Sequence, residues 1–91
     1  MRIDYENCRV LLEDGRVIKL SLIQTKILYI LYENAGKVVT YKELAKYIYN
    51  TTFLNKEIKI IITTAINTIK KKIKRNIEIK NVRGVGYLLK K

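Results

Sequence analysis

Asn81-Val82-Arg83-Gly84-Val85-Gly86-Tyr87-Leu88-Leu89, near the end of the chain, has the pattern of a short β-hairpin. Apolar residues flank a turn that contains two glycines, and Arg83 stands at its tip. The hairpin follows a lysine-rich segment, residues 57–74, in which isoleucines recur at the spacing of an amphipathic helix. The sequence therefore predicts a basic helix that leads into a two-stranded wing with an arginine at its tip.

Positive charge is concentrated in the same part of the chain. The protein has 91 residues, of which 19 are Lys or Arg and 8 are Asp or Glu, for a net charge of +11. Residues 56–91 hold 11 of the cations and only two acids, Glu57 and Glu78, so they carry +9 of this charge. Charge so segregated indicates a polyanionic partner. We expect double-stranded DNA, because a basic helix and a wing together can grip a duplex.

The composition excludes several classes of protein. With 91 residues and 48% hydrophobic content, the chain is expected to fold as one globular domain over residues 1–91. No apolar run reaches the roughly 18 residues of a membrane span. No signal-peptide core follows Met1. We expect a cytoplasmic protein that does not contact a membrane.

Residues for catalysis and metal binding are scarce. Histidine is absent and Cys8 is the only cysteine, which excludes a zinc finger, a histidine-based triad and an intramolecular disulfide. The acids are few and scattered, and no GxxxxGKS phosphate loop is present. We predict no catalytic residue, no metal site and no cofactor, and therefore not an enzyme. Cys8 lies among strand-forming residues and is expected to be a small buried apolar group.

Three regions follow one another along the chain. Residues 2–20 alternate apolar and polar side chains and predict a small antiparallel sheet. Asp14-Gly15 marks a hairpin within it, because both turn positions favour a positive φ. Residues 21–75 carry helical patterns and predict a three-helix core. The wing follows over about residues 77–90, with Asn81 to Gly86 as its turn.

Start and stop signals define the first two helices. The capping boxes Ser21-x-x-Gln24 and Thr40-x-x-Glu43 begin them. Gly36 suits the left-handed C′ position after the first helix. Val38-Val39 reads as a short extended link, and Asn50-Thr51-Thr52 ends the second helix.

The third helix, about residues 57–74, has two contrasting faces on a wheel of 100° per residue. Its apolar face should be buried, and it consists of Ile58, Ile62, Ala65, Ile66, Ile69 and Ile73. The opposite face should be free for a partner, and it consists of Ile60, Thr64, Asn67 and Lys71.

From Ile3 to Leu89 the chain resembles the C-terminal effector domain of OmpR/PhoB-type response regulators. Val82-Arg83-Gly84-Val85-Gly86-Tyr87 is very similar to the wing of that family. Supporting matches are Leu20-Ser21 with Gln24, Gly36-Lys37-Val38-Val39-Thr40 with Glu43-Leu44, and Ile66-x-x-Ile69-Lys70-Lys71-Lys72-Ile73. The resemblance implies an α+β fold: a winged helix-turn-helix with an N-terminal antiparallel sheet, three helices and a C-terminal β-hairpin wing.

The resemblance also implies sequence-specific binding of double-stranded DNA for transcriptional regulation. The third helix would lie in the major groove, and Arg83 of the wing would enter the minor groove. The candidates for base contacts are Thr64, Asn67, Thr68 and Lys71. The candidates for contacts to the DNA backbone are Lys70, Lys72, Lys74, Arg75 and Asn81. The negative helix C-terminus would explain only one or two of these cations.

Departures from the family suggest which bases are read. Thr68 and Lys70 stand where the family usually has arginines, so bidentate reading of guanine is not carried over to this position. Asn67 could pair with adenine, and Ile60 or Ile61 could meet thymine methyl groups, which together suggest an A+T-leaning site. Alternatively, the two isoleucines pack under the preceding loop or against a second protomer.

Further partners are implied by the resemblance. In the family, two copies bind in tandem on direct repeats, and the loop between the second and third helices can meet RNA polymerase. Here that loop is about residues 50–56, with Phe53, Leu54 and Asn55 as the contact candidates. No receiver domain precedes this segment, so no phospho-accepting aspartate is assigned. The chain is then either a domain cut from a longer regulator or a stand-alone regulator.

Three other functions remain open from the sequence. One is a general nucleic-acid-binding protein without sequence preference. Another is a winged-helix module that binds an acidic protein, with Ile60 and Ile61 central to the contact. The third is attachment to a membrane surface through the basic helix, which is disfavoured because the isoleucine face is needed for the core.

Overall fold

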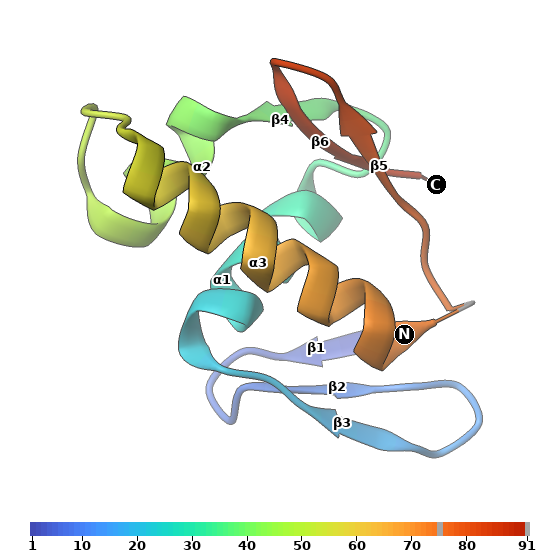
Figure 1. Ribbon diagram of the computed structural model, residues 1–91. Coiled ribbons are helices and arrows are strands. Elements are labelled where there is room, and N and C mark those ends of the chain that lie inside the picture. The colour runs from blue at the N-terminus through green and yellow to red at the C-terminus, as the bar shows by residue number, and fades with distance from the viewer. Residues whose placement is uncertain (75, 91) are drawn as a thin grey trace.

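The computed structural model describes residues 1–74 and 76–90. Two small antiparallel sheets flank three helices (Figure 1). The N-terminal sheet has the order β1-β2-β3, and the wing sheet has the order β4-β6-β5. The elements in chain order are β1 (Arg2–Asp4), β2 (Arg9–Leu11), β3 (Val17–Lys19), α1 (Leu22–Glu33), β4 (Val38–Thr40), α2 (Tyr41–Tyr49), α3 (Lys56–Ile73), β5 (Ile79–Val82) and β6 (Gly86–Leu89). This is the predicted α+β arrangement.

The β2–β3 hairpin has a three-residue loop. The N–H of Leu12 donates to the carbonyl of Arg16 at 2.9 Å, and the N–H of Gly15 donates to the carbonyl of Leu12 at 3.0 Å. Gly15 has φ +92°, whereas Asp14 does not have a positive φ. The hairpin was predicted correctly, but a positive φ at both turn positions was wrong, because a three-residue loop needs only one left-handed residue.

Cys8 is not the buried strand residue that was predicted. It has φ +50°, it is half-buried, and its N–H donates to the carbonyl of Tyr5 at 3.2 Å. It closes the turn between β1 and β2, and its carbonyl accepts from the N–H of Leu20 at 2.8 Å. The turn needs a left-handed residue at this point, and strand propensity does not override that need.

Both predicted capping boxes are present. At the start of α1 the N–H of Gln24 donates to Ser21 Oγ at 3.1 Å, and the N–H of Ser21 donates to Gln24 Oε1 at 3.0 Å. Thr40 and Glu43 exchange the same two bonds at the start of α2, both at 3.1 Å. A cap of this kind is worth about 0.5–2 kcal/mol, and each box places a helix start within one residue of its signal.

The helix ends follow the signals less closely. The C-cap of α1 is Asn34, so Gly36, with φ +89°, lies one residue beyond the predicted C′ position. Its N–H donates to the carbonyl of Leu89 at 2.8 Å, and Gly36 therefore turns the chain into β4 beside β6. Asn50 ends α2 in the left-handed conformation, with φ +54°, as its position predicted.

The wing is part of a three-stranded sheet. Val39 of β4 pairs with Tyr87 of β6, so the segment predicted as an extended link is a strand of this sheet. Asn81 and Val82 belong to β5 and pair with β6, which corrects their assignment to the turn. The turn itself contains only residues 83–85. Pairing with β4 joins the wing to the helical core, and a free hairpin would be marginally stable.

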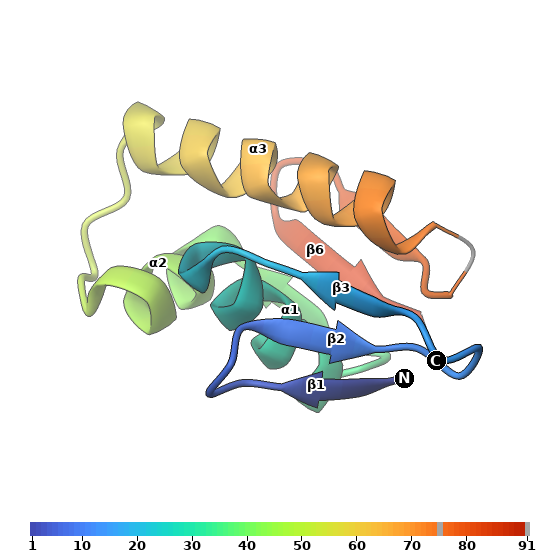
Figure 2. The same ribbon diagram turned by 90° about the horizontal axis from the view of Figure 1, so that it is seen from below.

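The third helix lies between the two sheets in Figure 1, and Figure 2 shows it along one edge of the molecule. Its predicted apolar face is buried: Ile62, Ala65, Ile66, Ile69 and Ile73 are at most 8% exposed, and Ile58 is half-buried. These side chains share one core with Ile27, Leu28 and Leu31 of α1. Full burial of such a side chain is worth about 1.5–3 kcal/mol, so the core determines which face of α3 stays exposed.

Candidate nucleic-acid interface

An asparagine cap fixes the start of α3. Asn55 is its N-cap, and the N–H of Ile58 donates to Asn55 Oδ1 at 2.8 Å. Asn55 therefore has a structural bond within the loop predicted for partner contacts. Phe53 in the same loop is 69% exposed, and Leu54 is half-buried. The helix occupies residues 56–73, one residue earlier at each end than predicted.

Charges along α3 match its dipole. Glu57 lies in the first turn, and Lys70, Lys71 and Lys72 lie in the last turn. Each such charge contributes about 0.3–1 kcal/mol when exposed. In Figure 1 the end of α3 that carries these lysines lies away from α2 and near the N-terminal sheet.

The outward face of α3 carries most of the predicted base-contact residues. Thr64, Asn67 and Lys71 are exposed, as the helical wheel predicted. Thr68 is only half-buried, and its hydroxyl donates to the carbonyl of Thr64 at 3.1 Å. That bond holds the hydroxyl against the helix backbone and leaves the Thr68 methyl group as its outward contact.

Two large apolar side chains are exposed on this face. Ile60 is 53% exposed and Ile61 is 40% exposed. Packing under the preceding loop, one of the alternatives for them, is therefore wrong. With Ile23, Gln24 and Thr68 they line a groove of about 300 Å³ between the start of α1 and α3. Ile60 and Ile61 thus form an exposed apolar pair next to the polar residues of the outward face.

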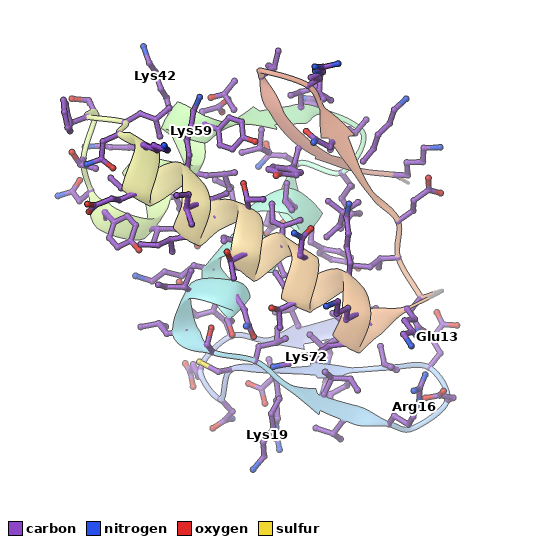
Figure 3. The ribbon with its side chains drawn as sticks, in the orientation of Figure 1. Glu13, Arg16, Lys19, Lys42, Lys59 and Lys72 are labelled. Carbon is purple, nitrogen blue, oxygen red and sulfur yellow. The ribbon has the colours of Figure 1, made fainter. Side chains whose placement is uncertain are left out.

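The residues predicted to contact the DNA backbone differ in their surroundings. Lys72 Nζ donates to the carbonyl of Lys19 at 3.0 Å and to Gln24 Oε1 at 3.1 Å, which ties α3 to the β3–α1 junction (Figure 3). Lys70 and Lys74 are exposed. Asn81 is exposed on β5, and Arg75 lies outside the described residues.

The wing tip is held in place by the second helix. Arg83 is exposed in the turn, where the N–H of Val85 donates to the carbonyl of Val82 at 2.9 Å and Gly84 has φ +75°. The N–H of Tyr41, the first residue of α2, donates to the carbonyl of Val85 at 3.1 Å. The position of Arg83 relative to the helices is therefore defined by the fold.

A tyrosine network lies beneath the wing. The hydroxyl of Tyr41 donates to that of Tyr87 at 3.3 Å, and the hydroxyl of Tyr87 donates to Thr63 Oγ1 at 3.4 Å. The two rings meet edge to face with centroids 5.6 Å apart. Burial raises the pKa of Tyr87, so its hydroxyl stays protonated at neutral pH. The network joins α2 and β6 to α3, the helix that carries most of the predicted DNA contacts.

Sequence reasoning missed two cations near the start of α3. Lys59 Nζ lies 5.1 Å from the ring centroid of Tyr41, a cation–π contact. Lys42 of α2 lies on the same side of the molecule (Figure 3). Both line a recess of about 270 Å³ together with Gly84 and Val85 of the wing. The distribution of charge along the sequence did not distinguish these two lysines from the other cations, because only the fold places them beside the wing.

Two negative findings concern the described residues. In residues 1–74 and 76–90, no group of three or more His, Cys, Asp or Glu side chains is placed to hold a metal ion. Over the same residues, no helix has the length and apolar content needed to cross a membrane.

The sequence matches one protein family over most of its length. The family described as "Transcriptional regulatory protein, C terminal" matches residues 15–89. No curated protein matches the chain.

Solved structures with the same fold are DNA-binding domains of response regulators. The domain of CssR from Bacillus subtilis has a TM-score of 0.81 at 14% identity, with 97% of each chain covered. The domain of AdeR, in complex with an intercistronic region, has a TM-score of 0.76 at 25% identity, covering 99% of this chain and 92% of AdeR's. The domain of RstA from Klebsiella pneumoniae, in complex with the RstA box, has a TM-score of 0.74 at 26% identity, covering 97% and 88%.

Proposed function

This chain belongs to the family of C-terminal domains of transcriptional regulatory proteins, of the OmpR/PhoB response-regulator type, and we propose that it reads duplex DNA through α3 and the wing. The family consists of transcription regulators and is not an enzyme class. The observation that carries the proposal is the outward face of α3, where Thr64, Asn67 and Lys71 are exposed beside a wing whose tip is bonded to α2.

In this proposal α3 lies in the major groove with its outward face toward the base edges. The amide of Asn67 recognises adenine, and the apolar groups of Ile60, Ile61 and Thr64 contact thymine methyl groups. The exposure of both isoleucines supports this assignment, because it leaves their side chains accessible to thymine methyl groups. Thr68 contributes its methyl group, since its hydroxyl is bonded to the helix.

Arg83 occupies the minor groove in the same proposal. Narrow A+T tracts concentrate negative potential there and attract arginine. The bond from Tyr41 to Val85 supports this role, because it joins the wing tip to α2, which packs against α3. Lys70, Lys74 and Asn81 contact phosphates on either side, and they position the protein without choosing a sequence.

The test is a selection from random duplex DNA followed by binding titrations at several salt concentrations. The protein should prefer its selected A+T-leaning site over random duplex by about a thousandfold or more. Arg83→Ala should weaken that binding. It should also make the slope of log binding constant against log salt concentration less steep by about 0.9, the value for one phosphate neutralised. Lys90→Ala is the matched control, because Lys90 follows β6 at the opposite end of the hairpin and pairs with Glu78 at 3.3 Å.

Each outcome assigns a different function. Equal binding to all duplexes would replace the regulator with a general nucleic-acid binder. Selected sites rich in guanine would contradict the assignment of Asn67, Ile60 and Ile61. Absence of binding even at low salt would leave the exposed isoleucines as the centre of a protein-binding surface.

We further propose that the loop before α3 contacts RNA polymerase. The support is Phe53, which is 69% exposed and lies three residues before the first residue of α3. Phe53→Ala should preserve DNA binding and reduce transcription from the target promoter. Asn55 is not a suitable test residue, because its substitution would remove the cap of α3.

Two further parts of the proposal concern assembly and location. Residues 1–91 act as one binding unit, and two copies occupy direct repeats in tandem. Sedimentation with duplexes that carry one or two half-sites should give complexes with one and two protein copies. A DNA-binding effector works where the chromosome is, so we propose a cytoplasmic location, which fractionation of cells that express the tagged protein would test.

A further inference from the structure

The tip of the β2–β3 hairpin lies beside the C-terminal end of α3. Between them is a cleft of about 610 Å³, lined by Asp14, Arg16, Lys71, Lys72, Lys74 and Asn76. All six side chains are charged or polar. The hairpin is distant from α3 in sequence, and only the fold places its arginine at the same cleft as the lysines of the helix.

The charge of this cleft is strongly positive. Among the described residues that line it, four are cations and Asp14 is the one acid. Asp14 is already bonded to Arg16, since Oδ2 accepts from Nε at 2.8 Å and Oδ1 accepts from the backbone N–H of Arg16 at 3.0 Å. These bonds to Arg16 lower the pKa of Asp14, which therefore stays ionised at neutral pH.

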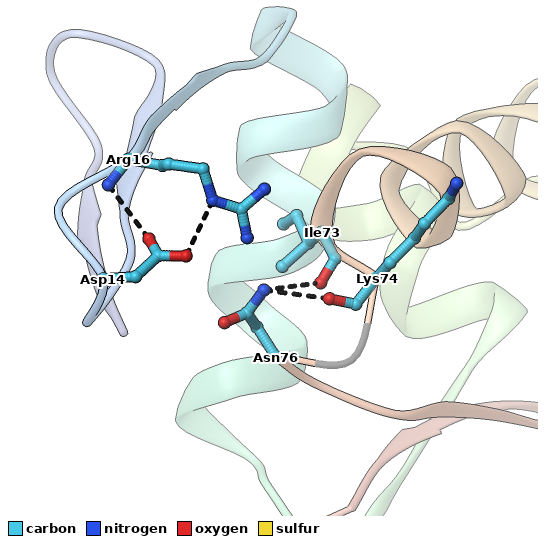
Figure 4. A network of polar contacts seen from close by, with 5 residues as sticks. All are labelled: Asp14, Arg16, Ile73, Lys74 and Asn76. Atoms are coloured by element: carbon cyan, nitrogen blue, oxygen red, sulfur yellow. Dashed lines mark hydrogen bonds and ion pairs between the residues drawn. The ribbon is translucent and has the colours of Figure 1, made fainter.

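Asp14 acts as a positioning residue for the guanidinium. Because Nε is the atom bonded to Asp14, the two Nη groups of Arg16 remain for another acceptor. Figure 4 shows the guanidinium turned from the hairpin toward Ile73 and the end of α3. The bond to Asp14 restricts the rotation of this exposed guanidinium, which favours binding of an anion.

Asn76 bonds two carbonyl groups at the end of α3. Asn76 Nδ2 donates to the carbonyl of Ile73 at 3.2 Å and to the carbonyl of Lys74 at 2.9 Å (Figure 4). The backbone N–H of Asn76 also donates to both carbonyls. These two carbonyls therefore do not need a lysine as partner, and Lys71 and Lys74 are exposed. Figure 4 shows the Lys74 side chain directed away from Arg16, so its ammonium group has to turn toward the cleft to bind a ligand there.

We propose that this cleft binds a phosphate group of the DNA backbone, so that Arg16 extends the DNA contact from α3 onto the N-terminal sheet. The inference rests on the proposed function, because α3 in the major groove brings its C-terminal end close to a phosphate strand. Guanidinium and ammonium groups are the side chains that bind phosphate oxygens most strongly. An acidic protein fits less well, since its interface would need an apolar anchor and the lining residues offer none.

The experiment measures binding to the selected duplex at several salt concentrations for the wild type, Arg16→Ala, Arg16→Lys and Arg9→Ala. Arg9 is the matched control: its Nε pairs with Asp4 Oδ2 at 2.7 Å, as Arg16 pairs with Asp14, but at the other end of β2. We expect Arg16→Ala to bind several-fold more weakly, with a salt dependence less steep by about 0.9. Arg16→Lys should retain part of the affinity, and Arg9→Ala should bind as the wild type does.

A second comparison tests whether the two elements share one phosphate. Arg16→Ala should cost less affinity in a Lys74→Ala background than in the wild type, because both side chains would bind the same group. Thermal melting of each variant verifies folding. If the ligand is the DNA backbone and not a free anion, millimolar inorganic phosphate at constant ionic strength should leave the difference in DNA affinity between the wild type and Arg16→Ala unchanged.

Three results would overturn the inference. Equal losses for Arg16→Ala and Arg9→Ala would mean that only overall charge matters. If the wild type binds the duplex and Arg16→Ala binds it with the same salt dependence, the cleft is not part of the DNA interface. The proposed function would not be affected by that result. Failure of the wild type to bind any duplex would overturn the proposed function and this inference together.

Discussion

Gly86 of β6 lies directly against the backbone of Val39 in β4. A Cβ built on Gly86 would collide with the carbonyl oxygen of Val39 and would lie 2.7 Å from the Cα of Thr40. Gly86 is buried and does not have a positive φ, so glycine is needed here for close approach. Gly86 was predicted to lie in the wing turn, but it belongs to β6, and Gly84 is the glycine that gives the turn its positive φ, +75°.

Gly86→Ala should destabilise the protein by about 1–3 kcal/mol or more, because the atoms that block the methyl group belong to the backbone and cannot move aside. Urea unfolding followed by circular dichroism would measure the change. Gly84→Ala is the matched control, since open space surrounds that position and only the cost of a left-handed alanine, about 1–2 kcal/mol, applies. A Gly86→Ala variant as stable as the wild type would contradict the close approach of β4 and β6.

Isoleucines on opposite sides of α3 should respond differently to truncation. Ile62→Ala removes a side chain that is 0% exposed and should cost about 2–5 kcal/mol of unfolding free energy. Ile60→Ala removes one that is 53% exposed and should change stability by no more than about 0.5 kcal/mol. Urea unfolding of both variants measures this contrast. If Ile60→Ala retains stability but loses DNA affinity, its side chain serves the partner and not the fold.

Asn67→Ala should reduce affinity for the selected site by about 1–3 kcal/mol and relax the preference at one base pair. Competition titrations against sites that differ at each position would reveal which base is affected. Lys70→Ala is the control, because loss of a phosphate contact should weaken binding to all duplexes by a similar factor. If Asn67→Ala also lost affinity for all duplexes by a similar factor, its side chain would contact the DNA backbone and not a base.

Tyr87 should make stability fall at alkaline pH. Burial raises its pKa above the ordinary value of 10.0, so its contribution is fully present below about pH 10 and is lost as the pH rises through the folded-state pKa. Urea midpoints measured from pH 8 to pH 11 should therefore decline more steeply for the wild type than for Tyr87→Phe. Tyr47, whose pKa is also raised by burial, contributes to the remaining decline in the variant.

Tyr87→Phe also tests the tyrosine network at neutral pH. Loss of the hydroxyl removes the partner of Tyr41 and Thr63, which should cost about 0.5–1.5 kcal/mol. An equally steep alkaline decline in the variant would show that the other ionising groups, and not Tyr87, cause it.

Local signals in the sequence predicted the helices well, because the atoms that make these signals lie within four residues of one another. The caps at Ser21 and Thr40 are examples, since each exchanges hydrogen bonds with the residue three positions ahead. The apolar period of α3 likewise predicted its buried face, because helical geometry alone places Ile62, Ile66 and Ile69 on one side.

Features that depend on distant residues were predicted poorly. An extended segment at Val38-Val39 was expected, but not its pairing with β6, and the role of Gly86 depends on the backbone of Val39. The left-handed turn at Cys8 likewise follows from chain closure between β1 and β2. No pattern within a short window contains these contacts.

The sequence by itself determined the order of elements, the helix starts, the exposed face of α3 and the basic character of its end, because capping, periodicity and charge are properties of neighbouring residues. Only the tertiary structure decided that β4 completes the wing sheet, that Tyr41 bonds to the wing tip, and that Arg16 lines one cleft with the lysines at the end of α3. Those relationships join segments far apart in the chain, and they exist only after the shared core has packed.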